Sequence, residues 1–454
     1  MPGTYLVGCG AGFSGDRTDA AVPVIAAIIA SGRPGALIFE TLAERTLALG
    51  QMARKNDPAL GYEPLLPEFL PPVLGDCVNS NIPIVGNFGA ANPHAAARLI
   101  QRMARDIGLS SLRIAIVEGD DINGVVDLST LEVCEGDAGL AGEQSAVIAA
   151  NVYLGAKPIA DALAAGAQIV VTGRVADPAL ALGPLVAHFG WGWEDLDKIA
   201  AGTLAGHLLE CGAQITGGYF ADPGYKDVPF PETIGFPIAE VSAQGEIVIT
   251  KPAGTGGLVN LRTVKEQLLY EMHDPAAYLT PDVTLDVTNV ELTQIGQDRV
   301  LVRGGAGHAA PERLKAIISY RGDWFGEGEI SYGGPNAMAR ARLAGDIVRK
   351  RISLRKLPVR IRIDLIGTQS IFDSDGGVLN MDGVPAPGEV RMRLAASGAG
   401  QKAVEASLRE VTALYTCGPA GGGGVRTRIQ NRIKTVSYLA PRAAVSPRFT
   451  FLAD

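Results

Sequence analysis

The stretch TYLVGCGAGFSGDRTDAAVPVIAAIIASGRPGALIFE, residues 4–40, holds two strand patterns separated by a helical one. The apolar run TYLVGCG (4–10) is typical of a buried strand, and ALIFE (36–40) reads as a second strand. Between them, a helical pattern ends at Gly32 and places four apolar residues on one face: Val22, Ile25, Ile28 and Ile29. A strand, a helix and a strand in this order predict a parallel βαβ unit.

The same alternation continues through the first half of the chain. It predicts helices over 41–53, 93–107 and 154–166, and strands over 82–89, 112–120 and 167–174. We therefore expect an α/β fold in which the N-terminal part is a mostly parallel sheet with helices on both faces.

The second half has a different pattern. Two segments read as hairpins: 239–250, turning at Gly245, and 285–305, turning near Gly296. Strands and helices then alternate over 316–320, 336–351, 359–367, 389–397, 401–415 and 425–439. This order predicts an α+β domain with hairpins and a split βαβ layer. We place the boundary near 216–226, which gives an α/β ligand-binding domain at 1–220 and an α+β domain at 221–454.

Composition limits the classes of partner. The net charge is 40 − 48 = −8 over 454 residues, which argues against nucleic acid as the main partner. The five cysteines are scattered without a CxxC pair, as expected of reduced thiols in the cytoplasm. The start of the chain lacks a signal-peptide pattern, and no apolar run is long enough to span a membrane. We expect a soluble cytoplasmic protein.

The glycines of GAGFSG (10–15) fit the GxGxxG fingerprint of dinucleotide-binding folds, with Glu40 placed for a ribose hydroxyl. Three details weaken this interpretation. Pro23 predicts that the helix begins near Asp19 or later, rather than inside the glycines. Glu40 follows Gly15 by 40 − 15 = 25 residues, beyond the usual spacing of about 20. A carboxylate at Asp16 would also lie beside the pyrophosphate.

Ligands of open α/β sheets bind beyond the carboxyl ends of the strands, and this chain places polar groups there after every predicted strand. Asn92 and Asp177 each precede a proline, so helix capping is the favoured interpretation for both. The catalytic candidates are Asp16, Glu40 and Glu44. The substrate-binding candidates are Ser14, Arg17, Arg45, Asn87 and Arg174, together with Gly421, Gly422 and Gly423 of the glycine run CGPAGGGGVR (417–426). A structural ion pair is the alternative for the Asp–Arg and Glu–Arg combinations.

Other residues give weaker signals. Oxygen ligands for Mg²⁺ could come from Asp16, Glu118, Asp120 and Asp121, but an acidic loop is the preferred interpretation. The five histidines lack zinc-binding spacing, and we expect no metal site. His207 is either a general base or a packed helix residue. Cys9 needs a nearby base to act as a nucleophile, and the sequence indicates none.

Seven segments, in order along the chain, together resemble the acyclic terpene utilisation family, which is named after the bacterial degradation of citronellol and geraniol. They are GCGAGFSGDRTDAA, LIFETLAERTLAL, DPALGYEPLL, NFGAANPHAAA, EGDDI, VTGRVADPALALGPL and CGPAGGGG. The resemblance implies a role in the catabolism of branched acids as CoA thioesters. Many relatives continue into a ferredoxin-like C-terminal segment that this chain, ending at Asp454, lacks. In shorter relatives a separate small protein supplies that segment, so the resemblance implies a small ferredoxin-like partner subunit.

The leading hypothesis is a lyase of the hydratase or dehydratase type that acts on a small branched carboxylic acid or its acyl-CoA. This chemistry needs an acid–base pair and an anion clamp, and it requires no redox cofactor. Two alternatives remain open: a nucleotide-dependent oxidoreductase that binds NAD or FAD, and a non-catalytic binding subunit whose partner carries the chemistry. In each case we expect a homo-oligomer.

Overall fold

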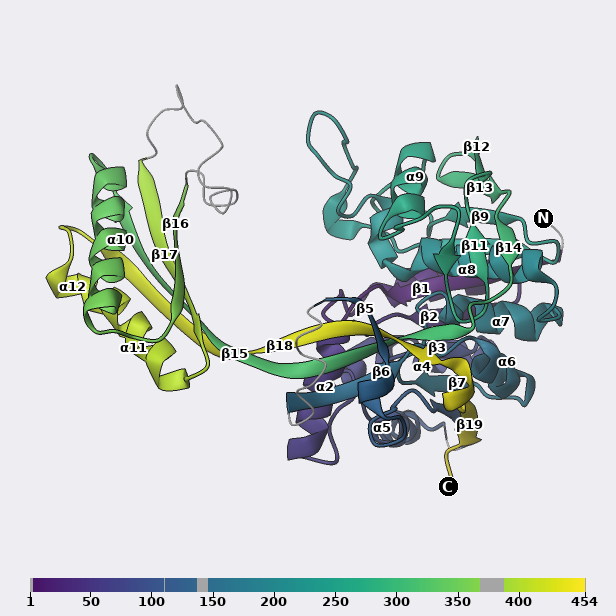
Figure 1. Ribbon diagram of the computed structural model, residues 1–454. Coiled ribbons are helices and arrows are strands. Elements are labelled where there is room, and N and C mark those ends of the chain that lie inside the picture. The colour runs from purple at the N-terminus through teal and green to yellow at the C-terminus, as the bar shows by residue number, and fades with distance from the viewer. Residues whose placement is uncertain (1–2, 110, 137–145, 368–387, 454) are drawn as a thin grey trace. The chain divides into compact units, whose positions relative to one another are not determined.

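The computed structural model describes residues 3–109, 111–136, 146–367 and 388–453, and the chain divides into two compact units. Unit 1 comprises Met1–Ser319 and Thr435–Asp454, and unit 2 comprises Tyr320–Lys434. The chain enters unit 2 through strand β15 (Arg313–Gly333) and leaves it through β18 (Gly423–Pro441) (Figure 1).

Unit 1 contains a ten-stranded sheet in the order β12-β13-β9-β8-β1-β2-β3-β7-β4-β19. Its five central strands are parallel, which confirms the predicted α/β class. They are β1 (Thr4–Ala11), β2 (Gly35–Phe39), β3 (Ile84–Gly86), β7 (Ile169–Thr172) and β4 (Ile114–Glu118). Because β7 lies between β3 and β4, the last two parallel strands along the chain exchange places in the sheet.

Antiparallel strands extend this parallel centre on both sides. On the β1 side lie β8 (Ile238–Ser242), β9 (Ile247–Thr250), β13 (Arg299–Arg303) and β12 (Glu291–Gly296), and on the β4 side lies β19 (Arg448–Phe451). Both predicted hairpins therefore exist, and Gly245 forms its turn with a φ of 85°. However, both belong to the first sheet, because β8 pairs with β1 from Ser242↔Thr4 onward.

The compact units consequently do not follow the expected division at 220. Strand β1 is buried along its whole length, so its open edge needs a hydrogen-bonding partner. The partner comes from more than 200 residues later in the chain, as the register Thr4↔Ser242 shows. Alternating apolar residues reveal a hairpin but not the strand with which it pairs.

The helices of unit 1 form two layers. One face of the sheet is covered by α1 (Ala21–Ser31), α4 (Pro71–Asn79) and α5 (Pro93–Asp106). The other face is covered by α6 (Lys157–Ala164), α7 (Ala179–Phe189) and α8 (Leu196–Glu210). Within each layer, neighbouring helices pack against one another, and all of these helices except α4 also have substantial contacts with the parallel strands. Right-handed crossovers explain the two layers, because the chain moves forward from β1 to β4 and then back to β7. The remaining elements are α2 (Glu44–Asn56), α3 (Leu66–Phe69), α9 (Leu261–Leu269), β5 (Glu132–Glu135), β6 (Val147–Val152), β10 (Tyr278–Leu279), β11 (Thr284–Asp286) and β14 (Ala306–His308).

Unit 2 has the element order β15-α10-β16-β17-α11-β18, with the strands in the spatial order β16-β17-β15-β18. This is a ferredoxin-like arrangement, and it confirms the predicted split βαβ layer. The bounds are α10 (Ala337–Leu354), β16 (Arg360–Ile366), β17 (Glu389–Gly398), α11 (Gln401–Thr412) and α12 (Leu414–Cys417).

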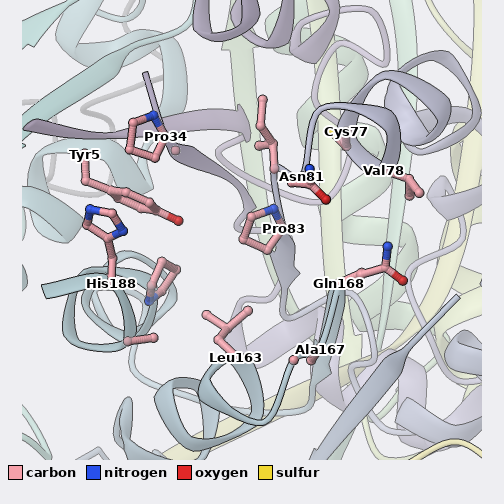
Figure 2. A pocket seen from close by; sticks show the side chains of 15 residues that line it. Tyr5, Pro34, Cys77, Val78, Asn81, Pro83, Leu163, Ala167, Gln168 and His188 are labelled. Carbon is pink, nitrogen blue, oxygen red and sulfur yellow. The ribbon is translucent and has the colours of Figure 1, made fainter. Parts of the chain in front are cut away.

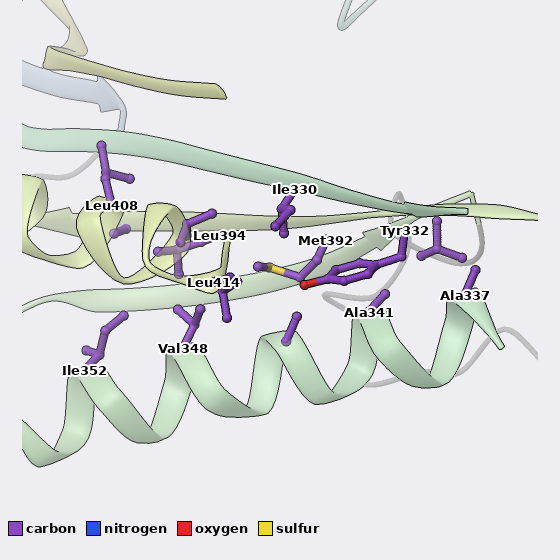
Figure 3. Close-up of a cluster of buried hydrophobic side chains, with 14 of the residues drawn as sticks. Ile330, Tyr332, Ala337, Ala341, Val348, Ile352, Met392, Leu394, Leu408 and Leu414 are labelled. Atoms are coloured by element: carbon purple, nitrogen blue, oxygen red, sulfur yellow. The ribbon is translucent and has the colours of Figure 1, made fainter. Parts of the chain in front are cut away.

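The core of unit 2 lies between its sheet and its two longer helices (Figure 3). Helix α10 turns Ala341, Val348 and Ile352 toward Met392 and Leu394 of β17. Small residues on α10 allow a close approach, since a Cβ at Gly345 would lie 3.0 Å from the side chain of Ile363. Truncating a buried residue such as Met392 to Ala is expected to cost about 2–5 kcal/mol.

Within the described ranges, no helix combines the length and the apolar character needed to cross a membrane.

Candidate active site

Polar residues gather at the carboxyl ends of β2, β3 and β7. Glu40 follows β2, Asn87 follows β3, and Arg174 and Asp177 follow β7. Direct contacts link the three strand ends, because Glu40 bonds to Asn87, and Arg174 bonds to the carbonyl oxygen of Leu42. Sequence reasoning chose this edge, and the structure brings Glu40, Asn87 and Arg174 together there.

Glu40 is buried, with 8% of its surface exposed. Its Oε1 accepts hydrogen bonds from the backbone nitrogen of Leu42 at 2.8 Å and from Nδ2 of Asn87 at 2.9 Å. Asn87 is itself fixed, because its Oδ1 accepts a bond from the backbone nitrogen of Thr41 at 2.7 Å. Burial and the nearby charge of Asp177 raise the pKa of Glu40 to about 8. Glu40 is therefore a carboxylic acid that holds its proton near neutral pH.

Arg174 is 1% exposed, and its side chain is saturated with acceptors. Its Nε donates to the carbonyl oxygen of Val175 at 2.9 Å, and its terminal nitrogens bond to Leu42, Val175 and Asp177. The guanidinium also lies over the ring of Tyr153, 4.4 Å from its centroid. With its planar fork engaged in this way, Arg174 supplies a fixed positive charge beside Glu40 rather than an open bidentate clamp.

Glu44, in the first turn of α2, has the opposite character. Its Oε1 accepts a hydrogen bond from the Tyr153 hydroxyl at 2.7 Å, and Nζ of Lys315 lies 3.8 Å away. Burial alone would raise the pKa of Glu44, but this hydrogen bond and the charges of Arg174 and Lys315 outweigh it and lower the pKa. The pKa of Glu40 is thus raised and that of Glu44 lowered. Such a difference allows one carboxyl group of a site to act as an acid while the other stays charged.

Asp120 supports the loop that follows β7. Its Oδ2 accepts bonds from the backbone nitrogen of Arg174 and from Nδ2 of Asn151, both at 2.9 Å. Gly173 must be glycine here, because a Cβ would lie 2.7 Å from Asp120 Oδ2. Burial raises the pKa of Asp120 to about 6. Among the described residues, no three His, Cys, Asp or Glu side chains are grouped to hold a metal ion.

The glycine loop after β1 differs from a dinucleotide-binding turn. Helix α1 begins at Ala21, beyond the glycines, as Pro23 indicated. The carboxylate of Asp16 accepts bonds from the backbone nitrogens of Gly12 at 2.8 Å and Arg17 at 2.9 Å. A Cβ at Gly12 would lie 2.5 Å from the backbone of Cys211. The loop therefore engages its own amide groups and packs against another segment where a pyrophosphate would have to bind.

The remaining binding candidates have different surroundings. Arg17 donates from both terminal nitrogens to the carbonyl oxygens of Pro231 and Glu232, at 3.1 and 3.0 Å. Arg45 is exposed and forms no hydrogen bond or ion pair with any described residue. Of the three candidate arginines, Arg45 alone has no bonding partner within the described part of the chain, so its guanidinium is available to bind a ligand. Ser14 lies partly exposed in the glycine loop.

The glycine run lies in unit 2, so the two groups of candidates occur in separate units. Gly421 has a φ of 72°, and the carbonyl oxygen of Ala420 accepts a bond from Arg340 Nη1 at 2.7 Å. A Cβ at Gly422 would lie 2.8 Å from Ile330, and one at Gly423 would meet nothing within 4 Å.

Glu210, at the end of α8, was not among the residues predicted from the sequence. Nδ1 of His207 lies 2.9 Å from Oε1 of Glu210, and both residues are buried. His207 is a helix residue, as one of its two interpretations stated, and its ring carries an acidic partner one turn away. A pattern of histidine and glutamate three residues apart in the apolar stretch LAGHLLECG could have drawn attention to the pair.

Cys9 has no role as a nucleophile in this geometry. It is fully buried, its Sγ lies 3.2 Å from the carbonyl oxygen of Ala11, and burial raises the pKa of its thiol. A buried neutral thiol reacts poorly.

A cavity of about 340 Å³ lies at the opposite edge of the sheet, at the amino ends of the parallel strands (Figure 2). Tyr5, Pro34 and Pro83 line it together with His188, whose ring stacks on Tyr5 with the centroids 4.3 Å apart. Ligands of open α/β sheets bind at the carboxyl ends, where Glu40 and Arg174 lie, so we place the candidate site there and not at this cavity.

Comparison with known proteins gave one extensive match. The model of the family described as "Acyclic terpene utilisation family protein AtuA" matches residues 5–451. No curated protein matches the chain. A solved structure described as "De novo designed protein Foldit4" matches at 9% identity and a TM-score of 0.18, covering 24% of this chain and 98% of that chain.

Proposed function

Since the chain belongs to the acyclic terpene utilisation family AtuA, we propose that it is a catabolic enzyme or enzyme subunit acting on a small branched carboxylic acid or its CoA thioester. The proposed chemistry is that of a hydro-lyase, which adds water to a double bond or removes it. A cytoplasmic location is part of the proposal, and it is supported by five cysteines that form no disulfide.

One observation carries the proposal: Glu40 is a buried carboxyl group at the carboxyl edge of the parallel strands, where ligands of such sheets bind, and its burial raises its pKa to about 8. In the dehydration direction, the bond between Cβ and the hydroxyl group breaks, and Glu40 gives its proton to the departing oxygen, which leaves as water. The proton lost from Cα goes to a second group of the site. General acid catalysis of this kind contributes about 10²–10⁴-fold in rate.

The charged neighbours of Glu40 support the same chemistry. Arg174, fixed by its backbone acceptors, stabilises the carboxylate that Glu40 becomes after it gives up its proton. Arg45 is the proposed contact for the carboxylate or phosphate groups of the ligand. Asp16 receives no proton-transfer role, because both of its oxygens accept bonds from backbone amides.

The first experiment is a thermal-shift screen of the purified chain against branched acids, branched acyl-CoAs, free CoA, NAD and FAD. A ligand at about 100 times its dissociation constant stabilises the native state by roughly 2.7 kcal/mol. Stabilisation by an acyl-CoA or an acid supports the proposal, whereas stabilisation by NAD or FAD alone contradicts it. Turnover of the ligand, followed as formation of the enoyl product, then separates an enzyme from a non-catalytic binding subunit.

Two pairs of variants assign the roles. Glu40→Gln should bind the ligand with turnover reduced by about 100-fold or more, while Glu68→Gln, an exposed residue of α3, should behave as wild type. Arg45→Ala should weaken ligand binding without changing the melting temperature. Lys55→Ala, at the far end of the same helix, is its control.

A further inference from the structure

The C-terminal end of α8 lies at the same edge of the sheet as Glu40. A Cβ at Gly206 would lie 2.5 Å from the carbonyl oxygen of Pro178, which directly follows Asp177. At the other side, the backbone of Cys211 packs against Gly12 of the loop after β1. Residues four apart share one helix face, so Glu210 lies one turn beyond Gly206 on the face that approaches Asp177.

Glu210 and His207 share one proton. Nε2 of His207 lies 3.1 Å from the carbonyl oxygen of Leu268, which can only accept, so Nε2 carries a hydrogen. Nδ1 faces Oε1 of Glu210 at 2.9 Å. The proton between them therefore rests either on Nδ1, giving an ion pair, or on Oε1, giving two neutral groups. The two forms differ only by a small movement of this proton between Nδ1 and Oε1. The pair can therefore take up a proton from a ligand and pass it on.

The second oxygen of Glu210 has no bonding partner among the residues that the structure describes. Glu210 is buried, with 8% of its surface exposed. Its Oε2 is buried as well and forms no hydrogen bond within the described residues. A buried carboxylate oxygen without a partner costs free energy, which a structure tolerates where a ligand group completes the site. The ring of Tyr278 packs against the His207 ring, with the centroids 5.2 Å apart.

The charges around Glu210 suit a base that works near neutral pH. Burial raises the pKa of Glu210 to about 7, the His207 cation opposes this rise, and the nearby charges of Asp177 and Glu271 add to it. Glu271 is held with a φ of 55°, in the left-handed region that side chains rarely adopt. Burial raises the pKa of both Glu40 and Glu210 toward neutral pH, the range in which a carboxyl group can act as an acid or as a base.

We propose that Glu210 is the general base that complements Glu40, and that His207 is the positioning residue that shares its proton. This inference rests on the function proposed above. Oε2 of Glu210 removes the proton from Cα of a branched 3-hydroxyacyl thioester and leaves an enolate, whose electron pair then forms the double bond between Cα and Cβ. The bond from Cβ to the hydroxyl group breaks, and the oxygen leaves as water with the proton of Glu40. The atoms balance without a redox cofactor.

The test separates the two half-reactions in the purified full chain. A branched 3-hydroxyacyl-CoA is incubated in D2O, and both deuterium incorporation at Cα and formation of the enoyl product are followed. Glu40→Gln should retain deuterium exchange and lose elimination. Glu210→Gln should lose both by about 100-fold or more, because no group removes the Cα proton. Glu68→Gln should match wild type in both measurements.

The failures are distinguishable. If wild type shows neither exchange nor elimination, the proposed function fails and the base role fails with it. If Glu210→Gln exchanges deuterium at the wild-type rate, the base role is overturned while the hydro-lyase function stands. Should Glu210→Gln not fold, Glu210→Asp keeps the charge and moves it back by one methylene group, and an undiminished rate of exchange in that variant overturns the assignment equally.

His207→Gln tests the positioning role. Removing the His207 cation should raise the pKa of Glu210, so the acidic limb of the kcat/KM profile should move to higher pH while KM changes little. A uniform loss of rate with an unmoved limb would show that His207 only stabilises the fold.

Discussion

The carboxylate of Asp16 accepts a hydrogen bond from the backbone nitrogen of Gly12 at 2.8 Å. The amide that a dinucleotide phosphate would use is thereby bonded within the loop, although the glycine spacing matches the fingerprint. The strand order gives a second reason. In this sheet β1 has the parallel β2 on one side and the antiparallel β8 on the other, so no crevice opens between two parallel strands beside β1.

We predict that NAD and FAD do not stabilise the chain. Replacing Asp16 by Ala should lower the free energy of unfolding by about 1–3 kcal/mol, because it leaves two backbone amides without their acceptor. The variant should still show no thermal shift with either dinucleotide. Denaturant unfolding and the same ligand screen check both parts, and tight binding of NAD to wild type would contradict the prediction.

The protonated state of Glu40 predicts a pH dependence of stability. Its pKa is raised to about 8 in the folded chain from an ordinary value of 4.5, so the native state binds one more proton than the unfolded state between these values. Stability should therefore fall as pH rises through this window, by at most about 1.4 kcal/mol per pH unit for this group, and level off above pH 8.

The variant Glu40→Gln isolates this contribution. Glutamine keeps an oxygen for the Leu42 amide and carries no charge, so the stability of the variant relative to wild type should rise with pH. Denaturant unfolding at several pH values between 5 and 9 measures the difference. Parallel curves for the two proteins would show that Glu40 is ionised in the native state.

Arg174 is expected to be essential for the fold. Replacing it by Met should cost about 3–5 kcal/mol, because Asp177 loses its partner and the carbonyl oxygens of Leu42 and Val175 lose their donor. Arg174→Lys should recover only part of the loss, since an ammonium cannot reach all these acceptors with one planar fork. Arg45→Ala is the control and should be neutral within about 0.5 kcal/mol.

The contact between α8 and α7 gives a matched pair of glycine substitutions. Gly206→Ala should destabilise the chain by about 1–3 kcal/mol, because its Cβ would lie 2.5 Å from the carbonyl oxygen of Pro178. Gly75→Ala in α4 meets only Ile107, at 3.9 Å, and should stabilise the chain by up to about 1 kcal/mol. Equal effects of the two substitutions would contradict the close packing of α8 described above.

The small ferredoxin-like partner remains a prediction from the family resemblance. The structure shows that this chain already contains a ferredoxin-like arrangement in unit 2, between β15 and β18. Mixing the chain with a candidate small protein, followed by size-exclusion chromatography with light scattering, measures whether a complex forms.

Local patterns in the sequence were sufficient for most individual elements. Apolar runs and helix stops depend on residues within one turn or one strand, which explains why β1, β2 and α5 were predicted within a few residues of their bounds. The position of Glu40 and Asn87 at the carboxyl edge of the sheet followed as well, because parallel strands align their carboxyl ends.

Only the tertiary structure decided the rest. The pairing of β8 with β1 joins residues more than 200 positions apart, and the hydrophobic pattern of a strand does not specify its neighbour. The same holds for charges. The sequence placed Arg174 among the possible clamps, yet its fork is occupied by Leu42, Val175 and Asp177. Glu210 was not among the predicted residues, and its contact with His207 appears only in the folded chain. Residue types follow from the sequence, whereas burial and hydrogen-bond partners, which set the pKa and the chemistry, exist only after long-range packing.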